Sequence, residues 1–308
     1  MKAPRVTLDQ WRTLQAVVDN GGFAQAADIL HRSQSSVSYT VARMQEQLGV
    51  PLLRIDGRKA VLTEAGDVLL RRSRQLVNQA SQLEHLAHHM EQGWEAEVRL
   101  VVDAAYPNAK LVRALTAFMP QSRGCRVRLR EEVLSGTEDL LREGTADVAI
   151  SGLNISGFLG SELSSVEFVA VAHPDHALHK LQRELSFLDL QTHMQVVIRD
   201  SGRLQPRDVG WLGAEHRWTV ASLATAATFV SNGLGFAWLP RHIIERELKE
   251  GLLLPLPLDQ GGTRNPSFYL YTDKEKPLGP ATQILIDLIK NFDAAPLNAS
   301  YAAPQPIN

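Results

Sequence analysis

The chain has 308 residues, of which 44% are hydrophobic and 21% are charged, and its formal net charge is −2. This length predicts about two domains, and the composition is typical of a globular protein. No apolar run is long enough to span a membrane and no secretory signal is visible, so we expect a soluble cytoplasmic protein without a membrane partner. The single cysteine, Cys125, excludes an internal disulfide and a cysteine-based zinc cluster.

The charges are divided unevenly along the chain. Residues 1–93 carry two more basic than acidic side chains, whereas the remainder carries four more acidic than basic ones. The direction of this asymmetry favours an anionic partner at the N-terminal end.

Three short helices are predicted within the first fifty residues. Thr7 and Gln10 have the spacing of a capping box that opens the first helix. The second helix is expected over 23–30. Ser33 is placed to cap the third helix, which Gly49 ends.

The third helix has two faces. An apolar stripe with helical spacing consists of Val37, Val41, Met44 and Leu48. Polar and small residues point away from it, namely Ser35, Ser38, Tyr39, Ala42 and Arg43, with Gln34 at the exposed N-terminal end. The pattern is typical of the second helix of a helix-turn-helix, which offers such groups to base edges and phosphates. The solvated face of an ordinary helical hairpin would look the same, and this alternative stays open on polarity alone.

A basic hairpin follows the three helices. Residues 51–62 have the pattern of two strands around Asp56-Gly57, a strong short-hairpin signal. It brings Arg54, Arg58 and Lys59 to or near the tip. A basic hairpin in this position is typical of the wing of a winged-helix domain, which contacts phosphate or the minor groove.

Segments 26–38, 48–52 and 62–66 together resemble the LysR-type bacterial transcriptional regulators. The sequence departs from the family pattern after Leu52, where Leu53 and Ile55 replace the usual Phe and Arg; Arg54 is therefore one place early, while Arg58 keeps its place. The resemblance puts Gln34, Ser35, Ser36 and Ser38 at the start of the recognition helix and Thr63 against DNA phosphate. The complete set of expected DNA-binding residues is Ser33, Gln34, Ser35, Ser36, Ser38, Tyr39, Arg43, Arg54, Arg58, Lys59 and Thr63.

A long helix is predicted from Glu64 to Gln92, a stretch without proline. Large apolar residues recur every seven positions at 62, 69, 76, 83 and 90, and small residues follow on one side. Such a heptad seam is expected where two helices approach closely, and the family uses a linker helix here for dimerisation. The predicted dimerisation residues are Leu69, Leu76, Ala80, Leu83, Ala87 and Met90. Packing of this helix on its own domain is the alternative.

Beyond Gly93 the pattern changes to alternating strands and helices, which predicts a parallel sheet covered on both faces. Two βα lobes joined by crossing strands resemble the effector-binding domain of the family, similar to periplasmic binding proteins. The expected domains are a winged helix-turn-helix at 1–63, a linker helix at 64–93, and an α/β effector domain at 94–293. Within the last, lobe I covers about 94–165 and 267–293, and lobe II about 166–266. A disordered tail is expected at 294–308.

The expected ligand site follows from topology. Ligands of open α/β sheets lie beyond the carboxyl ends of strands, near helix N-termini. The residues at those positions are Asp103, Ala104, Ala105, Tyr106, Leu134, Ser135, Arg199, Asp200, Ser201, Ser222 and Leu223. We expect Ser135 and Ser201 to hold the effector from opposite sides, with Arg199 available to a carboxylate.

Catalytic signatures are absent from the sequence. It contains no Gly-x-Ser-x-Gly, no phosphate-binding Gly-Lys-Ser/Thr loop and no complete dinucleotide fingerprint. We therefore expect no enzyme activity, no metal and no cofactor.

The leading prediction is a LysR-type, sequence-specific DNA-binding transcriptional regulator that responds to a small molecule. Its expected partners are double-stranded DNA, the effector, further copies of the chain in a dimer or tetramer, and RNA polymerase. The alternative is a small-molecule receptor or enzyme whose N-terminal helices serve only as an assembly module.

Overall fold

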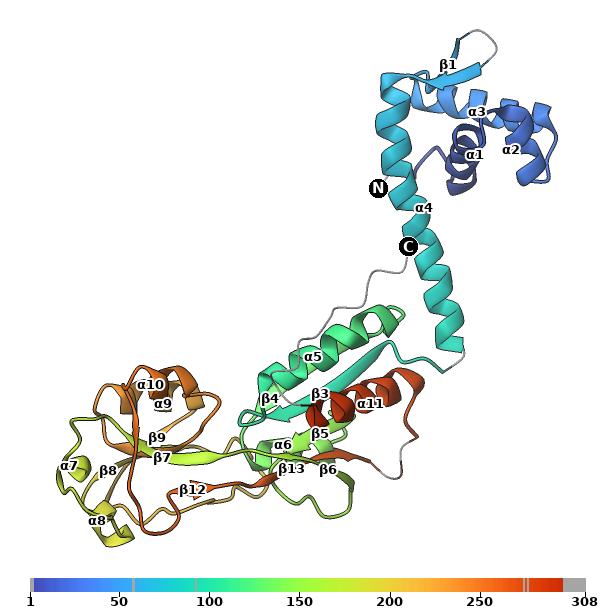
Figure 1. Cartoon of the computed structure of the whole chain (residues 1–308). Coiled ribbons are helices and arrows are strands. Elements are labelled where there is room, and N and C mark those ends of the chain that lie inside the picture. Colours follow the sequence, from blue (N-terminus) through green and yellow to red (C-terminus); the bar gives the residue numbers. More distant parts are fainter. Residues whose placement is uncertain (1–2, 57–58, 92, 274, 276, 296–308) are drawn as a thin grey trace. The chain divides into compact units, whose positions relative to one another are not determined.

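The computed structural model describes residues 3–56, 59–91, 93–273, 275 and 277–295 (Figure 1). The chain divides between Gln92 and Gly93 into two compact units. Within the described ranges, no helix combines the length and the apolar character needed to cross a bilayer.

The N-terminal unit consists of helices and one hairpin. Its elements are α1 (Leu8–Asp19), α2 (Phe23–Ile29), α3 (Gln34–Leu48), β1 (Leu53–Asp56), β2 (Lys59–Leu62) and α4 (Glu64–Glu91). Both bonds of the predicted capping box between Thr7 and Gln10 are present. Gly49 ends α3 in the left-handed region at φ 73°, a conformation that glycine adopts without strain.

One apolar cluster holds the N-terminal unit together. Leu14 of α1, Val37 and Met44 of α3, and Leu52 before the hairpin are all fully buried. Leu70 of α4 joins them, so the first turns of α4 belong to the same core. Burial of each such side chain contributes about 1.5–3 kcal/mol, which fixes α3 against α1 and leaves its other face outside.

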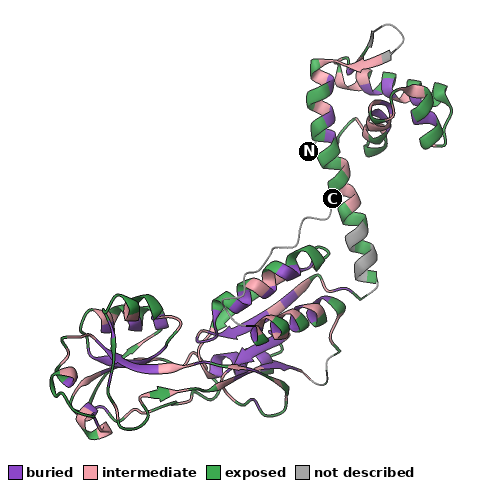
Figure 2. Cartoon of the chain, viewed as in Figure 1, coloured by how far each residue is buried: buried purple, intermediate pink, exposed green. Residues whose placement is uncertain are grey.

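The first lobe of the C-terminal unit is built on a five-stranded sheet. Its strand order is β4 (Arg126–Glu132), β3 (Glu97–Asp103), β5 (Val148–Ser151), β13 (Ser267–Thr272) and β6 (Leu159–Ser165). The helices are α5 (Asn108–Phe118), α6 (Ser135–Arg142) and α11 (Pro280–Ala294), with a short 3-10 turn at Met119–Gln121. The central strands β3, β5 and β13 are largely buried, whereas the edge strands β4 and β6 and the outer faces of the helices are mostly exposed (Figure 2).

The second lobe has a similar plan. Its sheet runs β11 (Leu254–Pro255), β7 (Phe168–Ala172), β10 (Phe236–Pro240), β8 (Met194–Ile198) and β9 (His216–Val220), and β12 (Thr263–Arg264) also pairs with β7. The helices are α7 (Ala177–Lys180), α8 (Phe187–Gln191), α9 (Leu223–Ser231) and α10 (Glu245–Lys249).

The expectation of parallel sheets is wrong in one respect. In each sheet three strands are parallel, β4-β3-β5 and β10-β8-β9. However, β13 runs antiparallel to β5 and β6, and β7 runs antiparallel to β10 and β11. The reason is that the chain crosses between the lobes and returns, so each sheet receives a strand in the opposite direction. The edge strand β11 is limited to Leu254–Pro255, since proline cannot donate to a ladder.

Two short links join the lobes. Residues 166–167 connect β6 to β7, and residues 265–266 connect β12 to β13. The links lie side by side, because Val166 N donates to Pro266 O over 3.1 Å. Figure 1 shows these paired strands running from one lobe into the other. The predicted tail at 294–308 overlaps the structure only at Ala294, which is helical, and at Ala295; residues 296–308 lie outside the described residues.

Candidate functional site

The apolar stripe of α3 determines which face of this helix is exposed. Val37, Val41 and Met44 are buried in the core, which turns Gln34, Ser35, Ser38, Tyr39 and Arg43 outward. Tyr39 is 64% exposed, an unusual position for a large aromatic ring. Its hydroxyl accepts a hydrogen bond from Arg43 Nη1 over 3.1 Å, so the two side chains form one polar surface.

Three of the expected DNA-binding serines lie at the start of this helix. Ser33 caps it, because its Oγ accepts from Ser36 N over 3.2 Å. Ser35 Oγ lies 3.0 Å from Ser33 Oγ. Ser36 itself is exposed. The cap orders the first turn, where the N–H groups of a helix are free to meet an anion such as phosphate.

The hairpin is tied to α3 and α4 by side-chain hydrogen bonds. Gln45 Oε1 accepts from Leu52 N over 2.7 Å and from Leu53 N over 3.0 Å. Thr63 Oγ1 donates to Pro51 O over 2.7 Å and accepts from Gly66 N over 2.9 Å, so its hydroxyl is engaged in capping α4. Gly66 is required there, because a Cβ at this position would collide with the Leu52 carbonyl.

The wing residues are only partly defined. Arg54 lies exposed on β1. Arg58 lies outside the described residues, as does the side chain of Lys59.

The predicted seam on α4 divides into two parts. Leu69 is half-buried against the core of its own unit, and Ser73 is buried, where its Oγ accepts from Gln15 of α1. Leu76 and Leu83 are 47% and 68% exposed. Packing on the chain's own domain therefore accounts for the beginning of the helix. Ala80 and Ala87 follow on the second part; the side chain of Met90 lies outside the described residues.

In the C-terminal unit, a cavity of about 490 Å³ opens where the two lobes meet. We call it the aromatic cleft, because its wall includes four aromatic side chains, Phe168, Trp211, Trp238 and Phe268. Five of the predicted ligand residues line it, namely Asp103, Ala104, Ala105, Leu134 and Leu223. The turns that follow these strands therefore meet at one cavity, beyond the strand ends where a ligand site was expected.

Asp103 lines the aromatic cleft and is only 4% exposed. Its carboxylate accepts from Ala105 N over 2.9 Å and from Leu134 N over 3.1 Å. Burial raises the pKa of Asp103 to about 6, although these two N–H groups oppose the shift and the charges of Asp200 and Glu131 add to it. Leu134 has a positive φ of 51°, a strained conformation for a leucine that the bond to Asp103 helps to hold.

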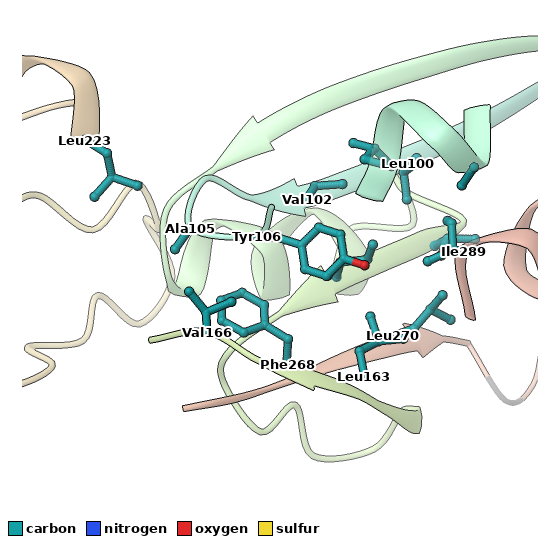
Figure 3. Close-up of a cluster of buried hydrophobic side chains, with 14 of the residues drawn as sticks. Leu100, Val102, Ala105, Tyr106, Leu163, Val166, Leu223, Phe268, Leu270 and Ile289 are labelled. Atoms are coloured by element: carbon teal, nitrogen blue, oxygen red, sulfur yellow. The ribbon is translucent and has the colours of Figure 1, made fainter. Parts of the chain in front are cut away.

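The prediction that Tyr106 lines the ligand site is wrong. Its side chain is 1% exposed and lies in the core of the first lobe, as Figure 3 shows, close to Phe268. Its hydroxyl donates to Asp293 Oδ1 over 2.9 Å. The chain turns sharply after the strand, since Tyr106 N donates to Asp103 O, and this turn directs the ring inward.

Ser135, Asp200 and Ser201 form direct contacts between the lobes instead of a ligand shell. Ser135 donates to Asp200 through its N, over 3.0 Å, and through its Oγ, over 2.6 Å. Ser201 Oγ accepts from Val133 N over 2.8 Å and donates to Val133 O over 3.1 Å. Both hydroxyls that were expected to meet the effector therefore have protein partners.

Charged groups extend these contacts. Asp139 Oδ2 accepts from the backbone N–H groups of Arg203 and Leu204, and Glu138 pairs with Arg207 over 2.7 Å. We call this set the interlobe bridge, consisting of Val133, Ser135, Glu138 and Asp139 of the first lobe with Asp200, Ser201, Arg203, Leu204 and Arg207 of the second.

Two further predicted residues lie outside the aromatic cleft. Arg199 is exposed and lines a neighbouring polar hollow beside the bridge. Ser222 caps α9 by accepting from Thr225 N.

Sequence reasoning missed the polar groups that face the cleft from the second lobe, Gln195 and Arg264, as well as Trp211 and Trp238. Gln195 lies inside a strand and Arg264 beside a link between the lobes. No local signal marks either residue, because their direction is set by how the two lobes face each other. The two tryptophans, out of five in the chain, were the available hint.

Comparison with known proteins assigns both units. Residues 8–67 match the model of the bacterial regulatory helix-turn-helix protein, lysR family, and residues 91–294 match that of the LysR substrate binding domain.

Relatives and solved structures agree with these matches. The probable HTH-type transcriptional regulator YhaJ of Escherichia coli K12 is 29% identical, over 82% of this chain and 86% of its own. The HTH-type regulator PunR of the same strain is 27% identical, over 80% and 81%. Full-length LysG of Corynebacterium glutamicum with bound effector Arg has a similar fold, with a TM-score of 0.51, 22% identity and coverage of 94% of this chain and 98% of that one. ArgP of Mycobacterium tuberculosis also has this fold, with a TM-score of 0.53, 19% identity and coverage of 92% and 96%. The chain belongs to the LysR family of transcriptional regulators, with an N-terminal helix-turn-helix and a C-terminal effector-binding domain.

Proposed function

We propose that this regulator reads base edges of double-stranded DNA through the exposed face of α3. The observation that carries the proposal is the row of amide, hydroxyl and guanidinium groups on that face, represented by Gln34, Ser38 and Arg43, opposite the buried stripe. These are the groups that discriminate base pairs in the major groove. Ser33, Ser35, Ser36 and Tyr39 complete the surface, and Arg54, Arg58, Lys59 and Thr63 are proposed to meet phosphate or the minor groove.

The smallest functional unit in this proposal is a homodimer formed through α4. Large aliphatic side chains exposed at heptad spacing, Leu76 and Leu83, favour a second helix that covers them, and Ala80 and Ala87 permit a close approach. Two such dimers would give a tetramer. A dimer presents two α3 helices to half-sites about 34–36 Å apart, or a multiple of this, on one face of the duplex. Binding beside a promoter would then bring the regulator within reach of RNA polymerase.

The effector is proposed to occupy the aromatic cleft and to shift the balance between open and closed lobes. A ligand can do so only through a difference in affinity for the two arrangements. We propose binding without catalysis, since the lining residues in the described part of the chain include no histidine, cysteine, serine or lysine that could act as a nucleophile.

The DNA-reading proposal is tested with duplexes that the full-length protein enriches from a random library. Ser38→Ala should reduce the preference for the enriched duplex over random DNA by about tenfold, because one good base contact contributes roughly 1–3 kcal/mol of discrimination. Ser122→Ala, in the C-terminal unit, is the matched control. If the protein enriches no sequence at all, the alternative of a receptor or enzyme with an N-terminal assembly module is favoured. Equal preference in both variants would remove Ser38 from the reading face.

The dimer is tested by light scattering. Leu83→Arg should separate the subunits and weaken DNA binding, since a charged side chain cannot be buried in the seam. Val68→Arg provides the control on the same helix, because Val68 is also exposed but does not belong to the seam. An unchanged oligomer in Leu83→Arg would contradict dimerisation through α4.

A further inference from the structure

Arg264 is a cation that lines the aromatic cleft and has no acidic partner in the part of the chain that the structure describes. Its guanidinium Cζ lies 5.4 Å from the centroid of the Trp238 ring, and Gly210 approaches the guanidinium so closely that a Cβ there would contact it. Its Nε is buried without a hydrogen-bond partner, and within the described ranges Arg264 forms no ion pair. Burial lowers the pKa of Arg264 from its usual value.

This arrangement differs from that of other arginines in the same unit. Arg99 pairs with Asp147 over 2.6 Å, and Arg207 pairs with Glu138 over 2.7 Å. A partly buried guanidinium without an anion carries a desolvation penalty that no internal ion pair offsets. The cation–π contact with Trp238 orients the group and compensates only part of that penalty. An anion supplied from outside would compensate the rest.

Gln195 presents a second unsatisfied group to the same cavity. Its side-chain Nε2 donates to Trp211 O over 2.9 Å, which fixes the orientation of the amide. Its Oε1 is buried and has no partner among the described residues. A buried acceptor of this kind favours a ligand that carries a hydrogen-bond donor.

The remaining wall sets the size and the body of the ligand. The cavity of about 490 Å³ falls within the range of about 300–1,000 Å³ for small-molecule sites. The aromatic side chains Phe168, Trp211 and Trp238 of the second lobe and Phe268 of the first contribute to this wall. Aromatic rings pack favourably against a planar ring at offset or edge-on angles.

We propose that the effector is a small aromatic carboxylate that carries a hydroxyl or amino group. Its carboxylate pairs with Arg264, its ring packs among the four aromatic side chains, and its donor bonds to Gln195 Oε1. This inference rests on the proposed function, because it assumes that the aromatic cleft is the effector site. It excludes a cationic effector such as the arginine bound to LysG of C. glutamicum.

The first test uses the unmodified full-length protein and four probes, with tryptophan fluorescence as the readout. The probes are 4-hydroxybenzoate, its uncharged analogue 4-hydroxybenzamide, benzoate, which lacks the donor, and cyclohexanecarboxylate, which lacks the aromatic ring. We expect 4-hydroxybenzoate to bind at least tenfold more tightly than the benzamide and several-fold more tightly than the other two. Equal binding of the charged and uncharged probes, or no binding by any of them at millimolar concentration, would overturn the inference.

The second test assigns the charge to Arg264. Arg264→Gln should weaken 4-hydroxybenzoate binding at least tenfold, and Arg264→Lys should recover part of the loss. Arg241→Gln removes an exposed arginine of the same lobe and is expected to change nothing.

Trp238→Leu separates this inference from the proposed function. One outcome is a neutral or cationic compound that alters DNA binding and binds more weakly to Trp238→Leu but equally well to Arg264→Gln. This outcome would overturn the proposed aromatic carboxylate but would keep the effector in the aromatic cleft. A compound that alters DNA binding with the same affinity in both variants would overturn the cleft as the effector site.

Discussion

The aromatic cleft and the interlobe bridge lie next to each other between the same two lobes, but they differ in whether their buried polar groups have hydrogen-bond partners. In the bridge, each carboxylate oxygen of Asp200 accepts two hydrogen bonds, from Ser135 and from the backbone of Gly202 and Arg207. In the cleft, Arg264 Nε and Gln195 Oε1 are buried and have no hydrogen-bond partner among the described residues. The bridge thus stabilises the contact between the lobes in the absence of a ligand, whereas the cleft gains stability only when something binds.

The difference explains why Ser135 and Ser201 bond to the opposite lobe and do not face the aromatic cleft. A hydroxyl group at a strand end can bind a ligand or bond to the opposite lobe. It bonds to the opposite lobe where that lobe provides a hydrogen-bond partner. Asp200 does so for Ser135. Among the described residues, no carboxylate pairs with Arg264. This guanidinium therefore remains able to bind an anion.

The largest effect is expected from Asp200→Ala, which breaks the bridge. It removes the acceptor of four hydrogen bonds, two of them between lobes, and bonds to a charged group contribute about 1.5–3 kcal/mol each. After relaxation and hydration of the freed donors we expect the C-terminal unit to lose about 3 kcal/mol of unfolding free energy in a urea titration. The control is Asp208→Ala, an exposed carboxylate in the same loop. Equal midpoints for the two variants would show that the bridge does not stabilise the lobes.

A smaller effect is expected from Gly202→Ala, which separates the lobes without removing a charge. A Cβ at this position would collide with Ser135 Oγ. Overpacking of this kind costs about 1–3 kcal/mol. Adding Ser135→Ala to the same protein should recover part of the loss in the urea titration, because it removes the colliding atom. Lack of any recovery would place the strain elsewhere.

The smallest effect concerns Asp103, which connects the two regions through Leu134. Its pKa of about 6 means that the carboxyl group is increasingly protonated below pH 6. An aromatic carboxylate should bind more weakly as the pH rises through 6, because ionised Asp103 then repels it, together with Asp200 and Glu131 nearby. We expect about a threefold change in the dissociation constant of 4-hydroxybenzoate between pH 5.5 and 7.5, since backbone N–H groups offset much of the charge. In Asp103→Asn this dependence should disappear; its persistence would assign the proton to another group.

The sequence predicted the elements with strong local signals and the turns that topology brings together. The cap at Thr7, the left-handed end at Gly49 and the apolar stripe of α3 are set by nearby residues, so they could be identified without a structure. Asp103 and Leu134 were found because parallel strands end at one edge.

The rest of the site depends on contacts that sequence spacing does not encode. Gln195 and Arg264 line the same cavity from different strands of the second lobe, and Trp238 comes from a third. Tyr106 follows Asp103 directly, but one tight turn carries its ring into the core. Parallel order failed for β7 and β13 because the direction of a crossing strand depends on where the chain returns, which strand periodicity does not report.

The paired links at 166–167 and 265–266 have a mechanical consequence. The two links lie side by side and are joined by the hydrogen bond from Val166 N to Pro266 O. Such a pair of links favours a hinge rotation of one lobe about the other and disfavours twisting or sliding. Arg264 and Asn265 lie beside the axis of this rotation and also line the cavity. A ligand that binds to Arg264 would therefore lie close to the hinge axis. A small displacement at the guanidinium would then become larger at parts of the second lobe that lie far from the links, such as α7 and α8 (Figure 1).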